Sequence, residues 1–289
     1  MLGKLLKHEW KGIYKVGCLF LVALLGVSFL GWLAFQSPMW RSLAEDTVYQ
    51  SGVLSLLDVA SVFTLFLYAL MLVAASVGIM VYLAIHFYKT MYTDEGYLTH
   101  TLPVTKNKLL FSKIFISGIW VMIVTVAVLL SLFGLMNSLI GAVLPESYSL
   151  IEFWSFFFNE FGEVLVIAFE EGLGLNLTVY TVYFIINLII SPFVSMIIIF
   201  GAISMGQLFT KHRVLMAIVS YFGVTLVSGI LGSVVEGIIT AAHVNSDSIE
   251  IVGSYFNTTL SASSIINIVV AVGMYLISYF VTTKKLNME

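Results

Sequence analysis

The chain has 289 residues, of which 60% are apolar and only 10% are charged. Soluble domains carry about 25% charged residues, so this composition excludes a water-soluble globular protein. Because each membrane-spanning helix needs about 20 mostly apolar residues, the length predicts one all-α, polytopic membrane domain over residues 1–289, with short loops.

Six uncharged, mostly apolar runs divide the chain, and each is long enough for one span. They cover residues 16–40, 59–88, 114–145, 172–210, 214–235 and 251–283. We predict six spanning helices near residues 17–36, 60–86, 115–140, 178–203, 214–235 and 263–283. The single cysteine, Cys18, falls in the first run, where we expect a buried, inert thiol.

The fourth run is unusually long and admits two interpretations. Two short passes around Ser191 and Pro192 would fit its length. One long helix, kinked or broken at Pro192, keeps the charge pattern of the following segments consistent. We prefer the single helix for that reason.

Charged residues alternate between the two sides of these spans. Of the 13 basic residues, all except Arg41 lie before the first span, between the second and third, between the fourth and fifth, or after the sixth. Most of the 16 acidic residues lie in the other segments. The positive-inside rule places the basic side in the cytoplasm, so we predict a plasma-membrane protein with both termini cytoplasmic.

Residues 1–15 are predicted to form an interfacial helix. At about 100° per residue, their lysines share one face and their apolar side chains lie nearly opposite. Such a helix sinks its apolar face into the headgroup region and keeps its ammonium groups near anionic lipid. The alternative is a basic tail that only orients the first span. The basic face carries Lys4, Lys7, Lys11 and Lys15, and the apolar face Leu2, Leu6, Trp10 and Ile13.

The segment 145–176, between the third and fourth spans, is rich in aromatic residues and glutamates. We predict one or two amphipathic helices on the outer side, because Trp and Phe favour the membrane interface. Two roles stay open, since the segment would either meet a cationic substrate at an exit route or rest on lipid. Its aromatic residues include Phe153, Trp154, Phe156, Phe157, Phe158 and Phe161.

Motifs of membrane enzymes are absent from the sequence. His8 and Glu9 begin a zinc-protease motif, but the second histidine of His-Glu-x-x-His is missing. The chain has no Gly-x-x-x-x-Gly-Lys-Ser/Thr phosphate-binding loop, and its five histidines are scattered. We therefore expect no enzymatic activity of its own, no metal or other cofactor, and no nucleic-acid partner.

Ionisable residues are missing from the interiors of the predicted spans. Proton- and ion-coupled carriers usually place such residues inside the bilayer, so their absence argues against a secondary transporter. Sodium sites built from backbone carbonyl groups stay open. Asn187 is the clearest polar group near a midplane, and we expect it to form a hydrogen bond between helices rather than bind substrate.

The most informative segment is the predicted cytoplasmic loop 87–113, which contains FYKTMYTDEGYLTHTLPVTKNKLL. Thr93 or Asp94 is placed to cap a short helix, and Pro103 would end it. Thr105 is placed to cap the helix that becomes the third span. The loop therefore predicts a short helix, a turn and the start of a membrane helix.

This loop resembles the permeases of ABC-2-type transporters, especially small Gram-positive members with an acidic-Gly-Tyr-Leu-Thr stretch before Leu-Pro and a basic turn. The amphipathic start, the six spans and a second short loop at 206–213 extend the resemblance over most of the chain. The outer segment departs from the commonest family pattern, in which it lies between the last two spans.

In that family, a separate ATPase subunit binds beneath the permease and receives the loop between spans two and three as a coupling helix. The resemblance implies that ABC ATPase subunits bind ATP and Mg²⁺, and that a second, identical or homologous permease completes the transporter. The alternative is that Asp94 and Glu95 form only a solvated turn, in which case the loop would not be an ATPase contact. The implied ATPase contact comprises Thr93, Asp94, Glu95, Gly96 and Tyr97, supported by Lys211, Arg213 and the initial helix.

The resemblance also implies a function, the permease subunit of an ATP-driven exporter. Exporters of lantibiotic-immunity and phenol-soluble-modulin systems are similar, which points to amphipathic or cationic peptides, or other amphiphiles, as substrates. Two alternatives stay open, a sodium-coupled carrier that acts alone and a membrane scaffold or sensor that transports nothing.

Overall fold

The computed structural model describes residues 2–37, 39–40, 56–93, 95–96, 101, 103–144, 149–172, 176–243 and 249–285. Within these residues the regular structure is entirely helical, and no strand is present. The expected all-α fold is confirmed.

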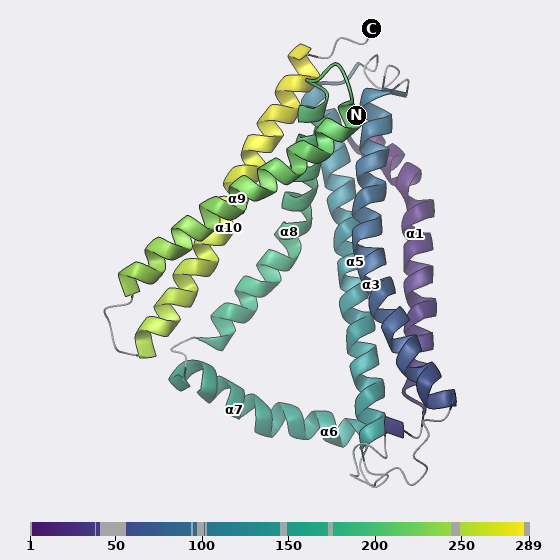
Figure 1. Cartoon of the computed structure of the whole chain (residues 1–289), viewed down its shortest axis with the longest axis vertical. Helices are drawn as coiled ribbons and strands as arrows, with labels where there is room; N and C mark the ends of the chain where they lie inside the picture. The colour runs from purple at the N-terminus through teal and green to yellow at the C-terminus, as the bar shows by residue number, and fades with distance from the viewer. Residues whose placement is uncertain are drawn as a thin grey trace. The chain divides into compact units, whose positions relative to one another are not determined.

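Six helices are long and apolar enough to cross a membrane, so the chain is a multi-pass membrane protein (Figure 1). All six are longer than the sequence predicted. They are α1 (Leu2–Ala34), α3 (Leu56–Tyr92), α5 (Lys106–Val143), α8 (Leu177–Gly206), α9 (Arg213–His243) and α10 (Ile249–Phe280). A π-helical turn, η3 (Val281–Lys285), follows α10.

Two of the helices, α3 and α5, are longer than the membrane core requires. α3 has 37 residues and α5 has 38. At about 1.5 Å per residue each is roughly 55 Å long, whereas the hydrocarbon core of a bilayer is about 30 Å thick. Several turns of each helix therefore extend beyond the core.

The fourth apolar run forms one helix, as preferred. α8 starts after Asn176, whose side-chain oxygen accepts a hydrogen bond from the backbone N–H of Val179. Pro192 is buried inside α8, and the helix continues through it instead of breaking there. Proline lacks the N–H that an intrahelical bond needs, but neighbouring helices make such a residue tolerable within a membrane.

The segment between α5 and α8 is helical, as expected for the amphipathic region. It consists of α6 (Leu150–Phe156), η1 (Phe157–Phe161), α7 (Gly162–Ile167) and η2 (Ala168–Gly172), the last two shorter than two turns each. Ser149 caps α6 by accepting from the backbone N–H of Glu152, and the Glu152 carboxylate accepts from the backbone N–H of Ser149. The hydrogen bonds with Ser149 hold the pKa of the Glu152 carboxyl below its usual range.

The chain divides into two compact units. Unit 1 comprises residues 1–12, 81–119 and 164–289, and unit 2 comprises 13–80 and 120–163. α1, α3 and α5 each run through both units.

Within unit 1, α8, α9 and α10 pack on one another (Figure 1). The end of α3 joins them because the ring of Phe87 stacks on the ring of Phe200, with centroids 3.9 Å apart. Gly206 ends α8 against α9, where a Cβ would lie 2.6 Å from the backbone nitrogen of Ala217. Only glycine allows this close approach.

Within unit 2, hydrogen bonds join the central parts of three helices. Ser131 on α5 bonds to Ser28 on α1 at 2.6 Å and to Tyr68 on α3 at 2.7 Å. Trp154 on α6 donates its indole N–H to Asn137 on α5 at 2.7 Å. Polar side chains thus link helices whose outer faces are apolar.

The outer faces of the long helices expose large apolar side chains, as a lipid environment requires. The buried stripe of α1 includes Ile13, Gly17 and Leu24. Cys18 lies off that stripe and is exposed, so the expectation of a buried thiol was wrong. The apolar run around Cys18 reflects contact with lipid rather than burial in protein.

Candidate functional site at the ends of α3 and α5

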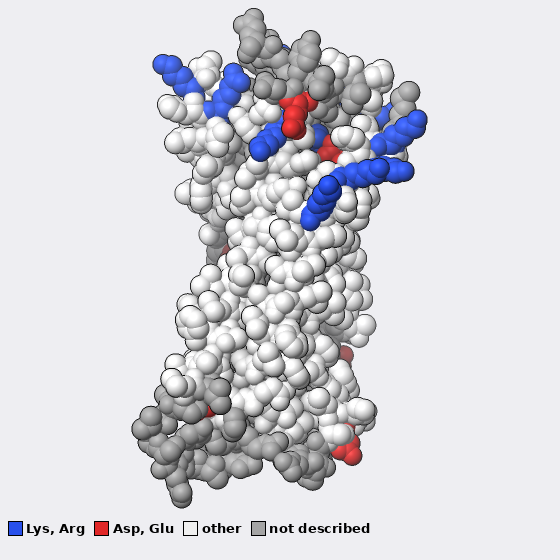
Figure 2. All heavy atoms as spheres, turned by 90° about the vertical axis from the view of Figure 1, so that its right-hand side faces the viewer, with Lys and Arg blue, Asp and Glu red and all other residues white. Residues whose placement is uncertain are grey.

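Basic side chains gather at one end of unit 1, which we call the basic end. The starts of α1, α5 and α9 and the ends of α3 and α10 meet there (Figure 1). Figure 2 shows the blue lysine and arginine side chains at one end of the face that is drawn, above a broad white surface. The residues are Lys4, Lys7, Lys11, Lys89, Lys106, Lys108, Lys211, Arg213 and Lys284.

The connection between α3 and α5 is shorter than predicted. Residues 87–92 belong to α3 and 106–113 to α5, which leaves residues 93–105 as the connecting segment. The charged residues at 89 and 113 bounded the predicted apolar runs, but both lie on helical turns beyond those runs. The backbone carbonyl of Thr105 accepts a hydrogen bond from Leu109, so Thr105 is where α5 begins, as predicted.

Thr93 follows the last residue of α3, and residues 95 and 96 are helical again, as the predicted short helix requires. The Thr93 hydroxyl donates to the carbonyl of Lys89 at 2.6 Å, on the α3 side. The backbone N–H of Gly96 donates to the carbonyl of Thr93 at 2.7 Å. Glu95 is exposed, whereas Asp94 and Tyr97 lie outside the described residues.

Gly96 sits against the last turn of α3. It is buried, and a Cβ at this position would lie 2.6 Å from the carbonyl carbon and oxygen of Met91. Backbone atoms cannot move aside as a flexible side chain can. Any larger residue at position 96 therefore displaces the start of the connecting segment.

A charged network of Glu9, His86, Thr90 and Lys113 lies beside this segment within unit 1. The Lys113 ammonium donates to Glu9 Oε1 and to Thr90 Oγ1, each at 2.7 Å. His86 Nε2 lies 3.5 Å from Glu9 Oε2. The side chains of Lys113 and Glu9 are only 2% and 7% exposed. The charged network therefore joins α1, α3 and α5 through buried charges.

The sequence did not predict the charged network. Glu9 was considered only as part of an incomplete zinc-protease motif, and Lys113 as one of many basic residues. A signal was present, because Glu9 lies three residues after Leu6 and four before Ile13, on the apolar face of the first helix. A carboxylate on a face that is otherwise apolar needs a partner.

A neutral network of Tyr92, Ser204 and Ser278 connects the same end of α3 to α8 and α10. The hydroxyls of Tyr92 and Ser204 are 2.7 Å apart, and Ser204 donates to Ser278 at 3.0 Å. The start of α5 is joined to α10 by a hydrogen bond from Tyr275 to Asn107. The connecting segment 93–105 is thus anchored at both of its ends.

The turn between α8 and α9 holds the second group of predicted contact residues. Lys211 and Arg213 are exposed on either side of His212, whose φ of 56° lies in the left-handed region. Both belong to the basic end of unit 1, as do Thr93, Glu95 and Gly96.

The predicted interfacial helix is helical, but it is not a separate element. α1 is continuous from Leu2 to Ala34, so no boundary divides residues 2–15 from the span. Lys4, Lys7 and Lys11 are exposed in unit 1, Lys15 is exposed in unit 2, and Trp10 is 37% exposed. Its position at a membrane interface stays a prediction.

Asn187 forms a hydrogen bond between two helices of unit 1. Its Oδ1 on α8 accepts from Ser264 on α10 at 3.3 Å, and its Nδ2 donates to the carbonyl of Tyr183 at 3.0 Å. Pro192 lies further along α8.

Comparison with known proteins adds no relative, because no family model, curated protein or solved structure matches the chain. In the part of the chain that the structure describes, no three His, Cys, Asp or Glu side chains come together to hold a metal ion. The functional argument therefore depends on the geometry of the basic end.

Proposed function

We propose that the chain is the permease subunit of an ATP-driven exporter, and that the connecting segment 93–105 contacts a separate ATPase. The observation that carries this proposal is the double anchoring of that segment. Buried polar side chains of its flanking helices tie α5 to α1 and α3 to α8 and α10. A solvated turn that merely joined two helices would need neither anchor.

The anchors supply a route by which a pull on the segment reaches the membrane helices. Because Lys113 bonds to residues of α1 and α3, displacement of the start of α5 carries both neighbours with it. Tyr92 transmits the same displacement to α8 and α10. Rigid elements joined in this way can switch between two arrangements when ATP closes the partner subunits.

The buried charges favour an alignment role over a purely stabilising one. A buried ion pair often adds no more stability than well-packed apolar side chains would. It does penalise misalignment, because separating the partners leaves uncompensated charge in an apolar surrounding. Glu9 and Lys113 therefore hold α1 and α5 in one register.

The orientation of the chain follows from the basic end. Positively charged segments tend to remain on the cytoplasmic side of a membrane, which supports an orientation with the basic end and both termini in the cytoplasm. α3 and α5 are long enough to extend several turns past the hydrocarbon core. The connecting segment would then be within reach of a cytoplasmic ATPase, the subunit that binds ATP and Mg²⁺.

The outer segment fits an amphipathic or cationic substrate. In unit 2, the rings of Phe153, Trp154 and Phe157 pack together, and Trp154 also packs on Phe133 of α5. Several carboxylates beside this cluster are exposed. Aromatic surface and negative charge suit a cationic amphiphile that leaves the membrane, with a second permease subunit completing the route. The exposed carboxylates are Glu152, Glu160 and Glu163.

Co-purification with ABC ATPase subunits made in the same cells tests the proposal. Gly96→Trp displaces the connecting segment, and Asp94→Lys reverses a charge on it. Both variants are expected to lower ATPase recovery about tenfold or more, as loss of a central contact does. Glu160→Lys is the matched control, because it makes the same kind of charge change on the α6–η1 surface, and recovery should be unchanged.

The results also separate the alternative functions. Full ATPase recovery with both segment variants would overturn the assignment of the contact. Substrate movement by the purified chain without any ATPase would favour a carrier that acts alone. A chain that neither binds an ATPase nor moves a substrate would be a scaffold or sensor.

A further inference from the structure

An apolar groove runs along the seam between α8 and α10 in unit 1. Its volume is about 330 Å³. Each wall covers eight residues of helix, which span about 10 Å at about 1.5 Å of rise per residue. The α8 wall is formed by Ile190, Phe193, Val194 and Ile197, and the α10 wall by Ile268, Ala271, Val272 and Tyr275.

A polar cluster of Tyr183, Asn187 and Ser264 lies at one end of the groove. Asn187 is one helical turn from Ile190, and Ser264 is one turn from Ile268, so the cluster and the groove form a continuous seam. Tyr183 and Ser264 share a hydrogen bond, and Ser264 donates to Asn187 at 3.3 Å. Tyr183 also donates to the carbonyl of Leu260 at 2.6 Å.

The cluster has unused hydrogen-bonding capacity. The contacts of Tyr183 with Leu260, of Tyr183 with Ser264 and of Ser264 with Asn187 each need a hydrogen, but the two hydroxyls supply only two. The carbonyl of Leu260 also accepts from the Ser263 hydroxyl at 2.9 Å, so Tyr183 can turn its hydroxyl to another acceptor without leaving Leu260 unpaired.

Two further hydroxyls extend this capacity. The oxygens of Tyr180 and Thr259 are buried without a hydrogen-bond partner among the described residues. Tyr180 precedes Tyr183 by three residues on the same face of α8, and Thr259 adjoins Leu260 on α10. Buried polar groups of this kind normally have a partner.

Side chains of α5 contact both walls of the groove. Tyr275 lines it and donates a hydrogen bond to Asn107 at the start of α5. The ring of Phe193 also packs beside that of Phe115 on α5, with centroids 6.0 Å apart. The walls are therefore held by side chains of a third helix.

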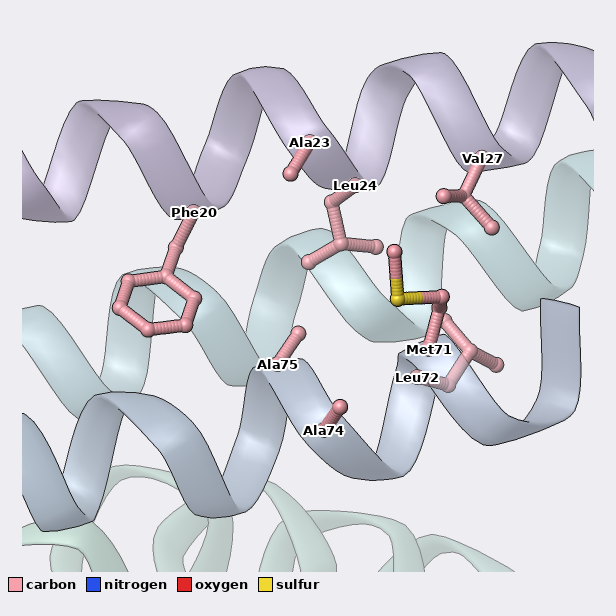
Figure 3. Close-up of a pocket in the computed structure, with 8 residues that line it drawn as sticks. All are labelled: Phe20, Ala23, Leu24, Val27, Met71, Leu72, Ala74 and Ala75. Carbon is pink, nitrogen blue, oxygen red and sulfur yellow. The ribbon is translucent and has the colours of Figure 1, made fainter. Parts of the chain in front are cut away.

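A second groove, between α1 and α3 in unit 2, provides a contrast (Figure 3). It has a volume of about 170 Å³, and every residue that lines it is apolar, including Phe20, Leu24 and Ala75. Figure 3 shows these side chains with no polar group among them. An ordinary lipid acyl chain can cover such an apolar surface, because the groove has no hydrogen-bonding group to be paired.

Inside a membrane, the apolar part of a groove cannot select a ligand by itself. Lipid tails are as apolar as leucine, so a chain gains little by moving from lipid into the groove. Polar contacts decide the preference, because a hydrogen-bonding group in hydrocarbon has few other partners. The groove and the cluster offer no charged side chain, so a matching head group is uncharged.

We propose that the seam between α8 and α10 binds a single-chain amphiphile with an uncharged amide or hydroxyl head. The head exchanges hydrogen bonds with Asn187, Tyr183 and Ser264, and the chain lies along the groove toward Tyr275. This site goes beyond the proposed ATPase contact, because its occupancy needs no nucleotide and no partner subunit.

Photolabelling of the full chain in phosphatidylglycerol bilayers tests this site. The probe is a long-chain fatty amide with a diazirine on its chain, and the matched probe is the alkane that lacks the head. The amide is expected to label peptides containing 190–197 or 268–275 several-fold more than the alkane does. Excess unlabelled fatty amide should remove that labelling.

Variants of the two grooves complete the test. Val272 is 55% exposed, so Val272→Trp fills the groove without crowding the core, and it should abolish labelling of the seam. Asn187→Leu and the milder Ser264→Ala should each lower labelling about five-fold, the effect expected for one hydrogen bond in a membrane. Ala74→Trp in the α1–α3 groove is the matched control and should leave labelling of the seam unchanged.

Two results would overturn the proposal. Equal labelling of the seam by the amide and the alkane would show an ordinary lipid chain in the groove. Unchanged labelling in Ser264→Ala would show that the polar cluster does not hold the head. Ser264→Ala removes only one hydroxyl from a part-buried position, so this variant should fold. It therefore tests whether the polar cluster holds the head group even if Asn187→Leu does not fold.

Discussion

The charged network and the neutral network hold the same segment with different chemistry. Glu9 and Lys113 carry full charges in a buried position and bond directly at 2.7 Å. Tyr92 and Ser204 use hydroxyl groups, and Ser204 has a further acceptor in the carbonyl of Phe200. A lost hydroxyl contact is replaced easily, whereas a lost ion pair is not. The charged network is therefore the stiff connection, and the neutral one is adjustable.

This difference assigns separate tasks to the helices of unit 1. We infer that α1, α3 and α5 move together, because the charged network permits only one alignment. α8 and α10 follow through contacts that accept small shifts of register. The comparison can be tested by removing single groups from each network.

The largest effect is expected for Lys113→Met. It leaves Glu9 as a buried carboxylate without its cation, which costs about 3–5 kcal/mol. Unfolding in a denaturing detergent, monitored by circular dichroism, measures this loss. A loss below about 1 kcal/mol would show that Glu9 reaches solvent and that the network is not stiff.

Replacing both charges separates stability from alignment. The double variant Glu9→Leu with Lys113→Met removes the buried charges together, and most of the lost stability is expected to return. ATPase binding should also return, whereas substrate-dependent ATP hydrolysis should remain low because the register of α1 and α5 is no longer fixed. Restored coupling in the double variant would contradict the alignment role of the pair.

A smaller effect is expected for Tyr92→Phe in the neutral network. The phenol hydroxyl is lost, but Ser204 keeps its bond to the carbonyl of Phe200, so no buried donor is left alone. The expected cost is about 1 kcal/mol. The same detergent unfolding measures it, and a cost as large as that of Lys113→Met would remove the distinction between the two networks.

The smallest effect is expected in α6, where the charge lies at the surface. Ser149→Ala removes the cap, so amide exchange should rise only in the first turn of α6. Because Ser149 lowers the pKa of Glu152, the carboxylate's contribution is present at neutral pH and is lost as the pH falls through that lowered pKa. Protection factors at neutral and acid pH, which correct for the pH dependence of amide exchange itself, measure both effects, and protection that is insensitive to pH would contradict the capping role.

The spans were predictable because the membrane itself sets their length. About 20 apolar residues are needed to cross the core, and each apolar run met that requirement. Their ends were underestimated, because Lys89 and Lys113 bounded the apolar runs although the helices continue past both residues. The apolar runs show which part of each helix faces the lipid core, but they do not show where the helix itself ends.

The charged network was not predictable in full. Glu9 and Lys113 are 104 residues apart in sequence, and their contact depends on how α1 and α5 pack. The sequence marked Glu9 as unusual on its face, but it did not identify the partner. Hydrogen bonds form only at distances of about 3 Å, so such a pair exists only where the packed helices bring both side chains together.

Site-specific crosslinking from the connecting segment tests the central claim most directly. A photoreactive amino acid replaces Thr101, which is exposed, in cells that also make the candidate ABC ATPase, and a matched probe replaces Phe158 in η1. The account predicts an ATPase crosslink from position 101 and none from position 158. Crosslinks from position 101 only to lipid or to extracytoplasmic proteins would contradict it.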